Sequence, residues 1–326
     1  MKAKILALLR SSEGYISGQE LCERFGVSRT AVWKVMNQLK EEGYEIEAVQ
    51  NKGYRLVHTP DVLSESELKS RMRTGWAGRN VHFLKETGST NADAVRFLEE
   101  GEAHGTLVVA DRQTAGRGRR GRSWESPSGA SVYMTLALKP EFGPGQASML
   151  TLVMALAVSE AISSVCGLKA GIKWPNDIVV NRKKVCGILT EMNMEADYIR
   201  SVVIGVGINV NQKVFPEEIR DTATSLSIEK GEEISRAELI ASVMAHFERH
   251  YEQFVQDQNL SGIKQAYEEG LVNRNRKVRV LDPKGEYEGI AEGITDTGEL
   301  MVRMDDGSIA EVYAGEVSVR GYYGYV

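Results

Sequence analysis

The chain has 326 residues, of which 42% are hydrophobic and 26% charged, and a formal net charge of −5. This length accommodates two or three domains of roughly 100–200 residues each, and the composition excludes a mainly disordered, collagenous or coiled-coil protein. The longest apolar run, residues 147–158, is shorter than the roughly 20 residues of a membrane-spanning helix, so we expect a buried helix there.

Targeting and redox features both favour the cytoplasm. Charged residues interrupt the short apolar stretch at the start of the chain, so we expect no signal peptide. The three cysteines, Cys22, Cys166 and Cys186, form no CxxC motif and have no histidine partners at metal-ligand spacing. This pattern favours a reducing compartment over a disulfide scaffold or a structural zinc site.

Residues 1–60 have the pattern of a winged helix-turn-helix domain. Ser17 is placed to cap a second helix, Gly26 to make the turn after it, and Ser28 to cap a third helix. Two short strands around a turn at residues 51–53 predict the wing. The order of these elements indicates a DNA-binding domain.

Basic residues gather at two places in the sequence. Residues 26–40 carry three bases and no acid, which is typical of a nucleic-acid contact and equally of a solvated helix face. Residues 112–122 contain five arginines and no acid. Because like charges repel, such a loop is costly unless an anion binds there for part of the time.

The remainder of the chain predicts two more domains. From residue 81 to residue 272, strand-like runs alternate with a few long helices, which predicts an α+β (mixed α/β) sheet domain. Residues 61–80 are expected to be a linker that contains one short helix. Residues 273–326 hold five short strands with glycine turns and no helix signal, which predicts a small β-barrel.

The most informative motif is QTAGRGRRGRSW at residues 113–124. Its glycines, from Gly116 to Gly121, have the G-x-G-x-x-G spacing of a dinucleotide-binding fingerprint. A Rossmann fold requires a helix to begin at these glycines, and the sequence that follows does not predict one. We interpret the motif as a mobile loop whose arginines bind phosphates or carboxylates and whose Trp124 covers a ring. A merely solvated basic loop is the alternative.

Three further motifs lie at the ends of strands or helices. KWPNDI, residues 173–178, is a polar turn, and Lys184 begins the next strand, where it can bridge a carboxylate and a phosphate; a surface lysine on a hairpin is the alternative. The glycines of GVGINVN, residues 205–211, leave one strand face bare for a flat ligand, or else mark a bulge. The turn at residues 87–91, taken alone, predicts only a helix N-cap.

A histidine pair, His246 and His250, has the i, i+4 spacing of metal ligands on a helix. The segment lacks the glutamate of an HExxH motif, and no third ligand lies nearby in the sequence. We therefore expect a solvated helix face here and no metal held by a protein cage.

Together these motifs resemble the biotin protein ligases. The motifs are GSTN at 88–91, QTAGRGRRGRSW at 113–124, KWPNDI at 173–178, KKVCGILTE at 183–191 and GVGINVN at 205–211. The segment ISGQELCERFGVSRTAVWKVMNQLKEEGY and the wing ending NKGYRL resemble the bifunctional, repressor type of this family. The resemblance covers essentially the whole chain, and it implies a winged helix, a biotinyl/lipoyl-ligase-like catalytic domain and a C-terminal SH3-like barrel.

The resemblance implies a two-step reaction. Biotin and ATP first form biotinyl-5′-AMP, and the biotinyl group then passes to a lysine of the biotin carboxyl carrier protein of acetyl-CoA carboxylase. It implies Lys184, Asp177 and Arg119 as catalytic residues, and Mg²⁺ that arrives with ATP. Biotin binding is implied for Ser89, Thr90, Asn91, Gln113, Arg117, Gly118, Arg119, Lys184, Gly187, Gly205 and Gly207. ATP or adenylate binding is implied for Arg117, Arg119, Arg122, Trp124, Lys173, Asn176 and Asn209.

The repressor type implies a second partner, operator DNA at genes for biotin synthesis or uptake, with biotinyl-5′-AMP as corepressor. Because one winged helix makes few base contacts, we expect a homodimer on an inverted repeat. The residues expected at the DNA are Ser28, Arg29, Thr30, Lys34, Lys52 and Arg55.

Three alternatives stay open at this point. A lipoate or octanoate ligase shares the central fold, but KWPND and GRGRRGR argue against it. A ligand-sensing transcription factor with a decayed active site is disfavoured because Arg117, Arg119, Lys184 and Asp177 are present. The third alternative is a ligase whose winged helix no longer regulates transcription.

Overall fold

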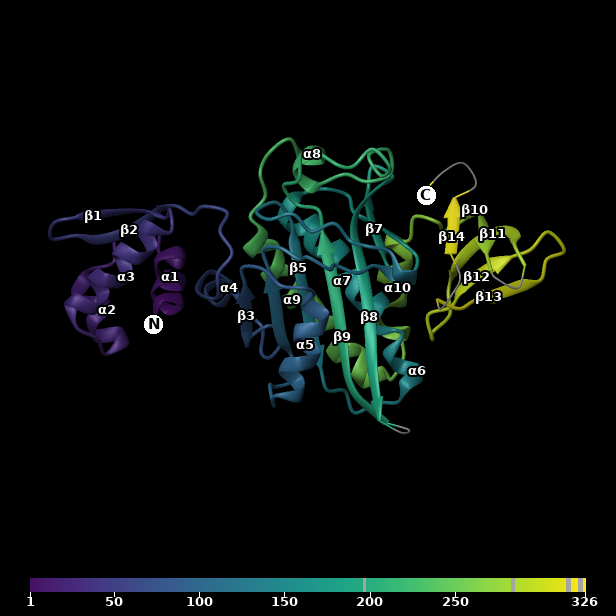
Figure 1. Ribbon diagram of the computed structural model, residues 1–326, viewed down its shortest axis with the longest axis horizontal. Coiled ribbons are helices and arrows are strands. Elements are labelled where there is room, and N and C mark those ends of the chain that lie inside the picture. Colours follow the sequence, from purple (N-terminus) through teal and green to yellow (C-terminus); the bar gives the residue numbers. More distant parts are fainter. Residues whose placement is uncertain (196–197, 283–284, 315–317, 322–324) are drawn as a thin grey trace.

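A computed structural model describes residues 1–195, 198–282, 285–314, 318–321 and 325–326. Its elements form three parts in a row, with an N-terminal domain at one end, a sheet domain in the centre and a smaller sheet at the other end (Figure 1). The mixed α and β composition confirms the predicted fold class.

The N-terminal domain has the predicted order of three helices and a hairpin. Ser17 Oγ accepts a hydrogen bond from Glu20 N, Gly26 adopts the left-handed conformation that ends the second helix, and Ser28 Oγ accepts from Ala31 N. These contacts are the caps that fix the helix ends. The elements are α1 Lys2–Ser11, α2 Gly18–Phe25, α3 Arg29–Glu41, β1 Glu45–Val49 and β2 Gly53–His58.

The central domain is built on a seven-stranded sheet in the order β3-β4-β5-β9-β8-β7-β6. Only the β3–β4 pair is parallel among these neighbours, and the other pairs are antiparallel. The strands are β3 Val81–Leu84, β4 Thr106–Ala110, β5 Val132–Leu138, β6 Gly171–Lys173, β7 Asp177–Val180, β8 Lys183–Glu195 and β9 Tyr198–Ile208.

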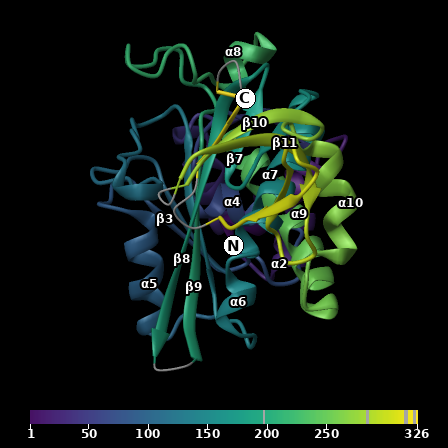
Figure 2. The ribbon, with the colours of Figure 1, turned by 90° about the vertical axis from the view of Figure 1, so that its right-hand side faces the viewer.

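Helices cover the two faces of this sheet unequally. Figure 2 shows α5 on one side and α7, α9 and α10 on the other. One helical stretch, Pro144–Cys166, is apolar and long enough to cross a membrane by composition, but most of it is buried within the protein, as in a core helix. The helices are α5 Thr90–Glu99, α6 Pro144–Ala147, α7 Leu150–Cys166, α8 Leu226–Lys230, α9 Arg236–Asp257 and α10 Ser261–Gly270.

The C-terminal part contains the five strands that the sequence predicted. They form an antiparallel sheet in the order β13-β12-β11-β10-β14. Its inward side chains join the core of the central domain. The strands are β10 Arg276–Leu281, β11 Tyr287–Ile294, β12 Leu300–Arg303, β13 Ile309–Val312 and β14 Ser318–Gly321.

The residues between the N-terminal and central domains are packed rather than free. They contain α4 Glu65–Arg71, whose Glu67 is completely buried. The Glu67 carboxylate accepts hydrogen bonds from Arg10 Nη2 at 2.9 and 3.1 Å, Tyr44 Oη at 2.7 Å and Arg71 Nε at 2.5 Å. Arg71 also contacts Glu238 of α9 at 3.1 Å. One carboxylate thus ties the N-terminal domain to the central domain.

A second attachment is centred on the buried side chain of Arg236. Arg236 Nε lies 2.7 Å from Asp61 Oδ2, just beyond the wing, and Arg236 Nη1 lies 3.1 Å from Asp111 Oδ1. Asp111 follows β4 and precedes the arginine-rich loop, and it also accepts hydrogen bonds from Ser128 Oγ and Gly129 N beyond the far end of that loop. One guanidinium therefore joins the linker to the base of the loop.

The Glu67 attachment predicts a selective weakening of the domain junction. Glu67→Gln removes the charge shared by Arg10 and Arg71, and loss of one partner in a buried ion pair costs about 3 kcal/mol or more. We expect calorimetry of the full chain to show a lower unfolding temperature for the N-terminal domain, and trypsin to cut residues 61–80 faster.

The control for this prediction is Glu65→Gln on the same helix. Glu65 forms an exposed i, i+4 pair with Lys69 at 3.1 Å, and such pairs contribute about 1 kcal/mol or less. Equal unfolding temperatures and cleavage rates for the two variants would contradict the assigned role of Glu67.

Candidate functional site: two adjoining cavities

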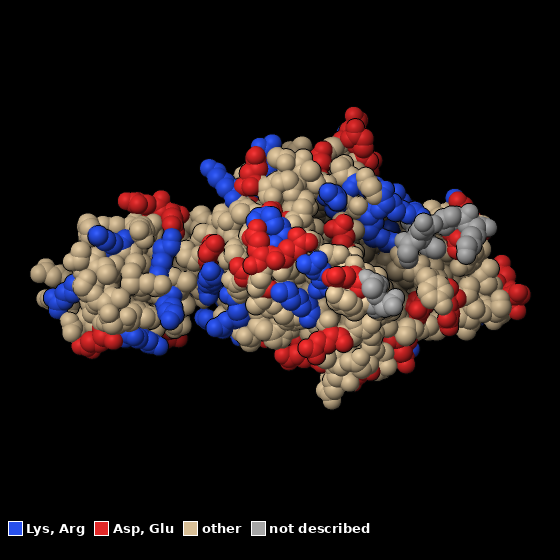
Figure 3. Space-filling view, turned by 60° about the horizontal axis from the view of Figure 1, so that its bottom comes forward, with Lys and Arg blue, Asp and Glu red and all other residues tan. Residues whose placement is uncertain are grey.

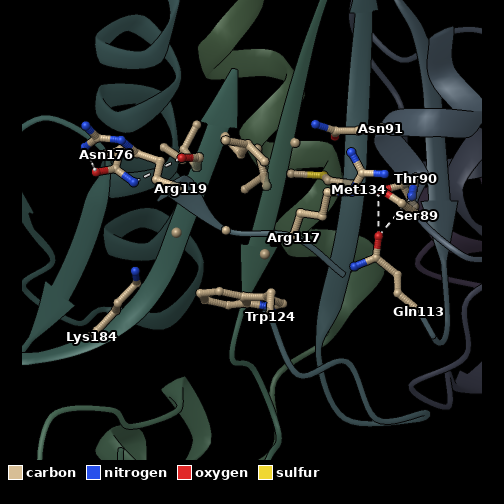
Figure 4. A pocket seen from close by; sticks show the side chains of 17 residues that line it. Ser89, Thr90, Asn91, Gln113, Arg117, Arg119, Trp124, Met134, Asn176 and Lys184 are labelled. Carbon is tan, nitrogen blue, oxygen red and sulfur yellow. Dashed lines mark hydrogen bonds between the residues drawn. The ribbon is translucent and has the colours of Figure 1, made fainter. Parts of the chain in front are cut away.

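A small cavity of about 50 Å³ lies on the α5 side of the sheet (Figure 4). It brings together the start of α5, the arginine-rich loop, the KWPND segment and the strands β5, β8 and β9. Every residue predicted to bind biotin lies on its wall. The wall consists of Ser89, Thr90, Asn91, Gln113, Arg117, Gly118, Arg119, Trp124, Met134, Asn176, Lys184, Gly187, Ile188, Leu189, Gly205, Val206 and Gly207.

Hydrogen bonds fix one polar wall of the small cavity. Gln113 Oε1 accepts from Thr90 N at 2.9 Å and from Thr90 Oγ1 at 3.1 Å, and Thr135 Oγ1 donates to Asn91 Oδ1 at 2.7 Å. Ser89 is the N-cap residue of α5, as the turn predicted, yet its side chain makes no capping hydrogen bond. The Ser89 hydroxyl therefore faces the cavity rather than serving the helix.

The glycines of β8 and β9 form the floor of the small cavity. A methyl group placed on Gly207 would lie 2.6 Å from the Trp124 ring, and one placed on Gly187 would lie 2.9 Å from it. At Gly205 a methyl group would meet Asn91 Oδ1. These strand positions must therefore be glycine, because Trp124 and Asn91 occupy the space that a side chain would need. The Trp124 indole Nε1 is buried there without a hydrogen-bond partner among the described residues.

A larger cavity of about 460 Å³ adjoins the first and is rich in cations. Figure 3 shows Lys and Arg side chains gathered beside the C-terminal sheet. Of the residues predicted to bind ATP, all but Arg117 lie here, and Arg117 lies on the small cavity. The predicted residues that line it are Gly118, Arg119, Arg122, Trp124, Lys173, Asn176, Asp177, Lys184 and Asn209.

Asp177 is the centre of a charged cluster in the larger cavity. Lys184 Nζ lies 2.6 Å from Asp177 Oδ1, and Lys173 Nζ lies 4.0 Å from Asp177 Oδ2, which also accepts a hydrogen bond from the Tyr325 hydroxyl. Burial alone would raise the pKa of Asp177, but the charges of Lys184 and Lys173 outweigh it and hold this pKa below its usual value. Asp177 is therefore a carboxylate at neutral pH and a weak proton acceptor.

Burial has the opposite consequence for Lys173. It lowers the pKa of Lys173 to about 8, although Asp177 partly compensates. The Lys173 ammonium also lies 3.6 Å from the centre of the Tyr325 ring, a cation–π contact. The charge of this lysine thus changes within an accessible pH range.

The arginine-rich loop connects the cavities to the C-terminal sheet. Arg119 Nη1 donates to Asn176 Oδ1 at 2.8 Å, and Arg119 Nη2 donates to the carbonyl of Ala314. The loop contains only a single 3₁₀ turn, Arg119–Gly121, as expected for a motif that is not a dinucleotide-binding fingerprint. Arg112, the first arginine of the stretch, pairs instead with Glu86 at 2.7 Å.

Several wall residues were missing from the sequence prediction. Met134, Ile188, Leu189 and Val206 belong to apolar strands whose pattern gives no sign of a ligand. Arg320 and Tyr325 belong to the C-terminal part, and the turn at residues 212–223 completes the larger cavity. The sequence carries no local signal for these residues, because the fold alone brings them to the KWPND segment.

The N-terminal domain presents most of the predicted DNA contacts to solvent. Arg29, Thr30 and Lys34 are exposed on α3, and Lys52 is exposed on the wing. Several predicted residues also contact other parts of the domain. Ser28 Oγ caps α3, and Arg29 Nη2 donates to Gln19 Oε1 at 3.1 Å. Arg55 pairs with Glu47 at 2.7 Å and stacks on Tyr15. Trp33, 57% exposed on the same face as Thr30 and Lys34, was missing from the prediction.

Comparison with known proteins identifies the family. The chain is 42% identical over 307 residues to the bifunctional ligase/repressor BirA of Bacillus subtilis, with 94% of each chain covered. It is 32% identical to the protein of that name from Escherichia coli, covering 97% of this chain and 96% of the other. The chain belongs to the biotin protein ligase family. The resemblance found in its motifs is confirmed.

Family models match each part of this ligase separately. Residues 2–55 match an HTH domain, residues 83–209 the biotin/lipoate A/B protein ligase family, and residues 275–320 the biotin protein ligase C terminal domain. A solved biotin protein ligase from Aquifex aeolicus, in complex with biotin and ATP, is 35% identical with a TM-score of 0.65. It covers 74% of this chain and 99% of its own. The catalytic and C-terminal parts therefore have the fold of an established ligase.

Lys173 makes anion binding in the larger cavity pH-dependent. Below its pKa of about 8 the ammonium is present, and above it the charge is lost. AMP is a suitable probe, because the second pKa of a phosphate monoester is about 6 and its charge is constant above neutrality. We expect calorimetry to show AMP binding that weakens several-fold between pH 7 and pH 9.

Lys173→Arg provides the matched control, because a guanidinium keeps its charge throughout this range. The variant should bind AMP with an affinity that varies little with pH. The same pH dependence in both proteins would show that another group titrates.

Proposed function

We propose that this protein is an ATP-dependent biotin protein ligase that also represses transcription. The observation that carries the enzymatic half is the small cavity, where residues from five separated motifs meet at the cation-rich cavity around Asp177. The ligase activates biotin as biotinyl-5′-AMP and transfers biotin to a lysine of the biotin carboxyl carrier protein of acetyl-CoA carboxylase. Free cysteines and the partners named here suit the cytoplasm.

The first step joins two anions, so positive charge controls its rate. A carboxylate oxygen of biotin attacks the α-phosphorus of ATP, and the bond to the β-phosphate oxygen breaks as pyrophosphate leaves. Lys184, Lys173 and the arginines of the loop neutralise the reacting groups. Biotin occupies the small cavity with its carboxylate toward Lys184, which lines both cavities.

The larger cavity also suits Mg²⁺ that arrives with ATP. Mg²⁺ takes oxygen ligands and is held mainly by substrate phosphates and water. Asn209 lines the cavity, and its Nδ2 donates to Thr224 O at 3.1 Å, which leaves the amide oxygen to serve as a ligand. The ion would supply further charge neutralisation at the phosphates.

The second step transfers the acyl group to an amine. The neutral amine of the carrier lysine attacks the acyl carbon, the bond from that carbon to the phosphate oxygen breaks, and AMP leaves. The nitrogen releases its proton to water. The low pKa of Asp177 makes it a poor proton acceptor. We therefore assign Asp177 to orienting the ammonium groups around it rather than to general-base catalysis.

Lys184→Ala tests the adenylation site. Removing the ammonium beside the biotin carboxylate should reduce biotin-dependent pyrophosphate release by at least about a hundredfold. Lys183→Ala is the matched control, because Lys183 is the preceding residue of β8 and its side chain points to the other face of the sheet. Normal pyrophosphate release by Lys184→Ala would remove this lysine from the mechanism.

The repressor half rests on the exposed basic face of α3. We propose that Arg29, Thr30 and Lys34 contact the major groove of an operator and that two chains bind as a homodimer on an inverted repeat. Biotinyl-5′-AMP acts as the corepressor. A ligase with a non-regulatory winged helix is the competing function.

Arg29→Ala separates the two functions. We expect this variant to lose operator binding in a gel shift and to biotinylate carrier protein at the normal rate, because Arg29 lies on α3 and lines neither ligand cavity. Arg24→Ala, an exposed arginine on α2, is the control and should keep both activities. Sedimentation of the unchanged protein with operator DNA, with and without biotin and MgATP, distinguishes a regulated repressor from the competing function.

A further inference from the structure

Three side chains that line neither ligand cavity converge between α7 and α9. Glu160 Oε2 lies 2.8 Å from His246 Nδ1 and 2.8 Å from His250 Nε2. These three atoms all lie within 4.8 Å of one another. No third ligand lies near the two histidines in the sequence, but the fold brings Glu160, about 90 positions earlier, to both rings. The expected solvated helix face is wrong for His250, which is buried.

Two imidazoles and a carboxylate form a ligand set for zinc and similar divalent ions. Zinc sites of the His₂Glu type use three protein ligands and leave a fourth position open to water. Ligand atoms about 2.0–2.2 Å from a tetrahedral ion are separated from one another by roughly 3.3 Å. Outward movement of the two rings by about half an ångström from their present contacts with Glu160 would reach that spacing.

A positive group already faces all three atoms. Arg249 Nη2 lies 2.6 Å from Glu160 Oε2, 3.1 Å from His246 Nδ1 and 3.3 Å from His250 Nε2. The Arg249 side chain is 62% exposed, so it can turn into solvent without disturbing the core. The arrangement thus favours a cation beside Glu160, and the Arg249 guanidinium that is there now can be displaced.

The cluster can also be reached from solvent. His246 and Glu160 are partly exposed, which provides a path from solvent.

We propose that Glu160, His246 and His250 form a binding site for one divalent transition-metal ion of the zinc type. The ion displaces Arg249 and joins α7 to α9. Glu248, which precedes Arg249 on α9, accepts hydrogen bonds from the backbone of Gly75, Trp76 and Ala77 between the first two domains. A metal at this point therefore stiffens the helix to which that segment is anchored.

The test uses the full-length protein after removal of metals with a chelator. Calorimetry with Zn²⁺ should show one ion bound per chain, and Co²⁺ should give the visible absorption of a four-coordinate site. His246→Ala and Glu160→Gln should each weaken Zn²⁺ binding by at least about tenfold. Addition of Zn²⁺ should raise the unfolding temperature of the unchanged protein and should not raise that of these variants.

Two further variants make the test specific. Arg249→Ala should bind Zn²⁺ several-fold more tightly, because it removes the competing cation. His82→Ala is the control, since His82 pairs with Glu102 at 3.0 Å as a two-residue contact and should leave Zn²⁺ binding unchanged.

The proposal fails under either of two results. The first is Zn²⁺ binding that is equal in the unchanged protein, His246→Ala and Glu160→Gln. The second is no 1:1 binding of Zn²⁺ or Co²⁺ by a folded Arg249→Ala variant, whose site has lost its competitor. Neither result depends on ligase activity, so the proposed function is tested separately.

Discussion

The ligand site depends on one carboxylate that holds like charges together. Lys173 and Lys184 would repel each other across a cavity that also contains Arg119 and Arg122. Asp177 contacts both lysines and so allows them to stay in place before any anion arrives. This arrangement is preorganised, because the charges need not be gathered during the reaction.

Asp177 also links the two parts of the protein that enclose the larger cavity. The Tyr325 hydroxyl donates to Asp177, and the Tyr325 ring covers Lys173. Arg119 makes a parallel link, since it contacts both Asn176 and the carbonyl of Ala314. The C-terminal part is therefore a wall of the site and not an independent appendage.

Motifs predicted most of the lining of the two cavities because they occupy adjacent strands. β7, β8 and β9 are neighbours in the sheet, so the segments that begin or end them open onto one cavity. The caps at Ser17 and Ser28 were predictable for a similar reason, since a cap acts within three residues of itself.

Contacts between distant segments could not be predicted in this way. Glu67 meets Arg10 and Tyr44 only when α4 is docked, and its sequence neighbours are those of an ordinary exposed helix. The same is true of Glu160 and the histidines of α9. Burial alone would raise the pKa of Asp177, but the fold places the charges of Lys184 and Lys173 beside it, and they lower this pKa.

Trp124 connects these observations to the linker. Its ring covers the glycine floor, and the remaining space of about 50 Å³ holds little more than a water molecule or two. A ligand with fused rings can enter this space only if the Trp124 indole moves away from the glycine floor. The loop that carries Trp124 is anchored at Asp111. Because Asp111 and Asp61 share the Arg236 guanidinium, the base of the loop and the linker are held by one side chain. In the repressor proposed above, ligand binding and DNA binding would be coupled reciprocally, so DNA binding would change the affinity for the ligand by the same factor.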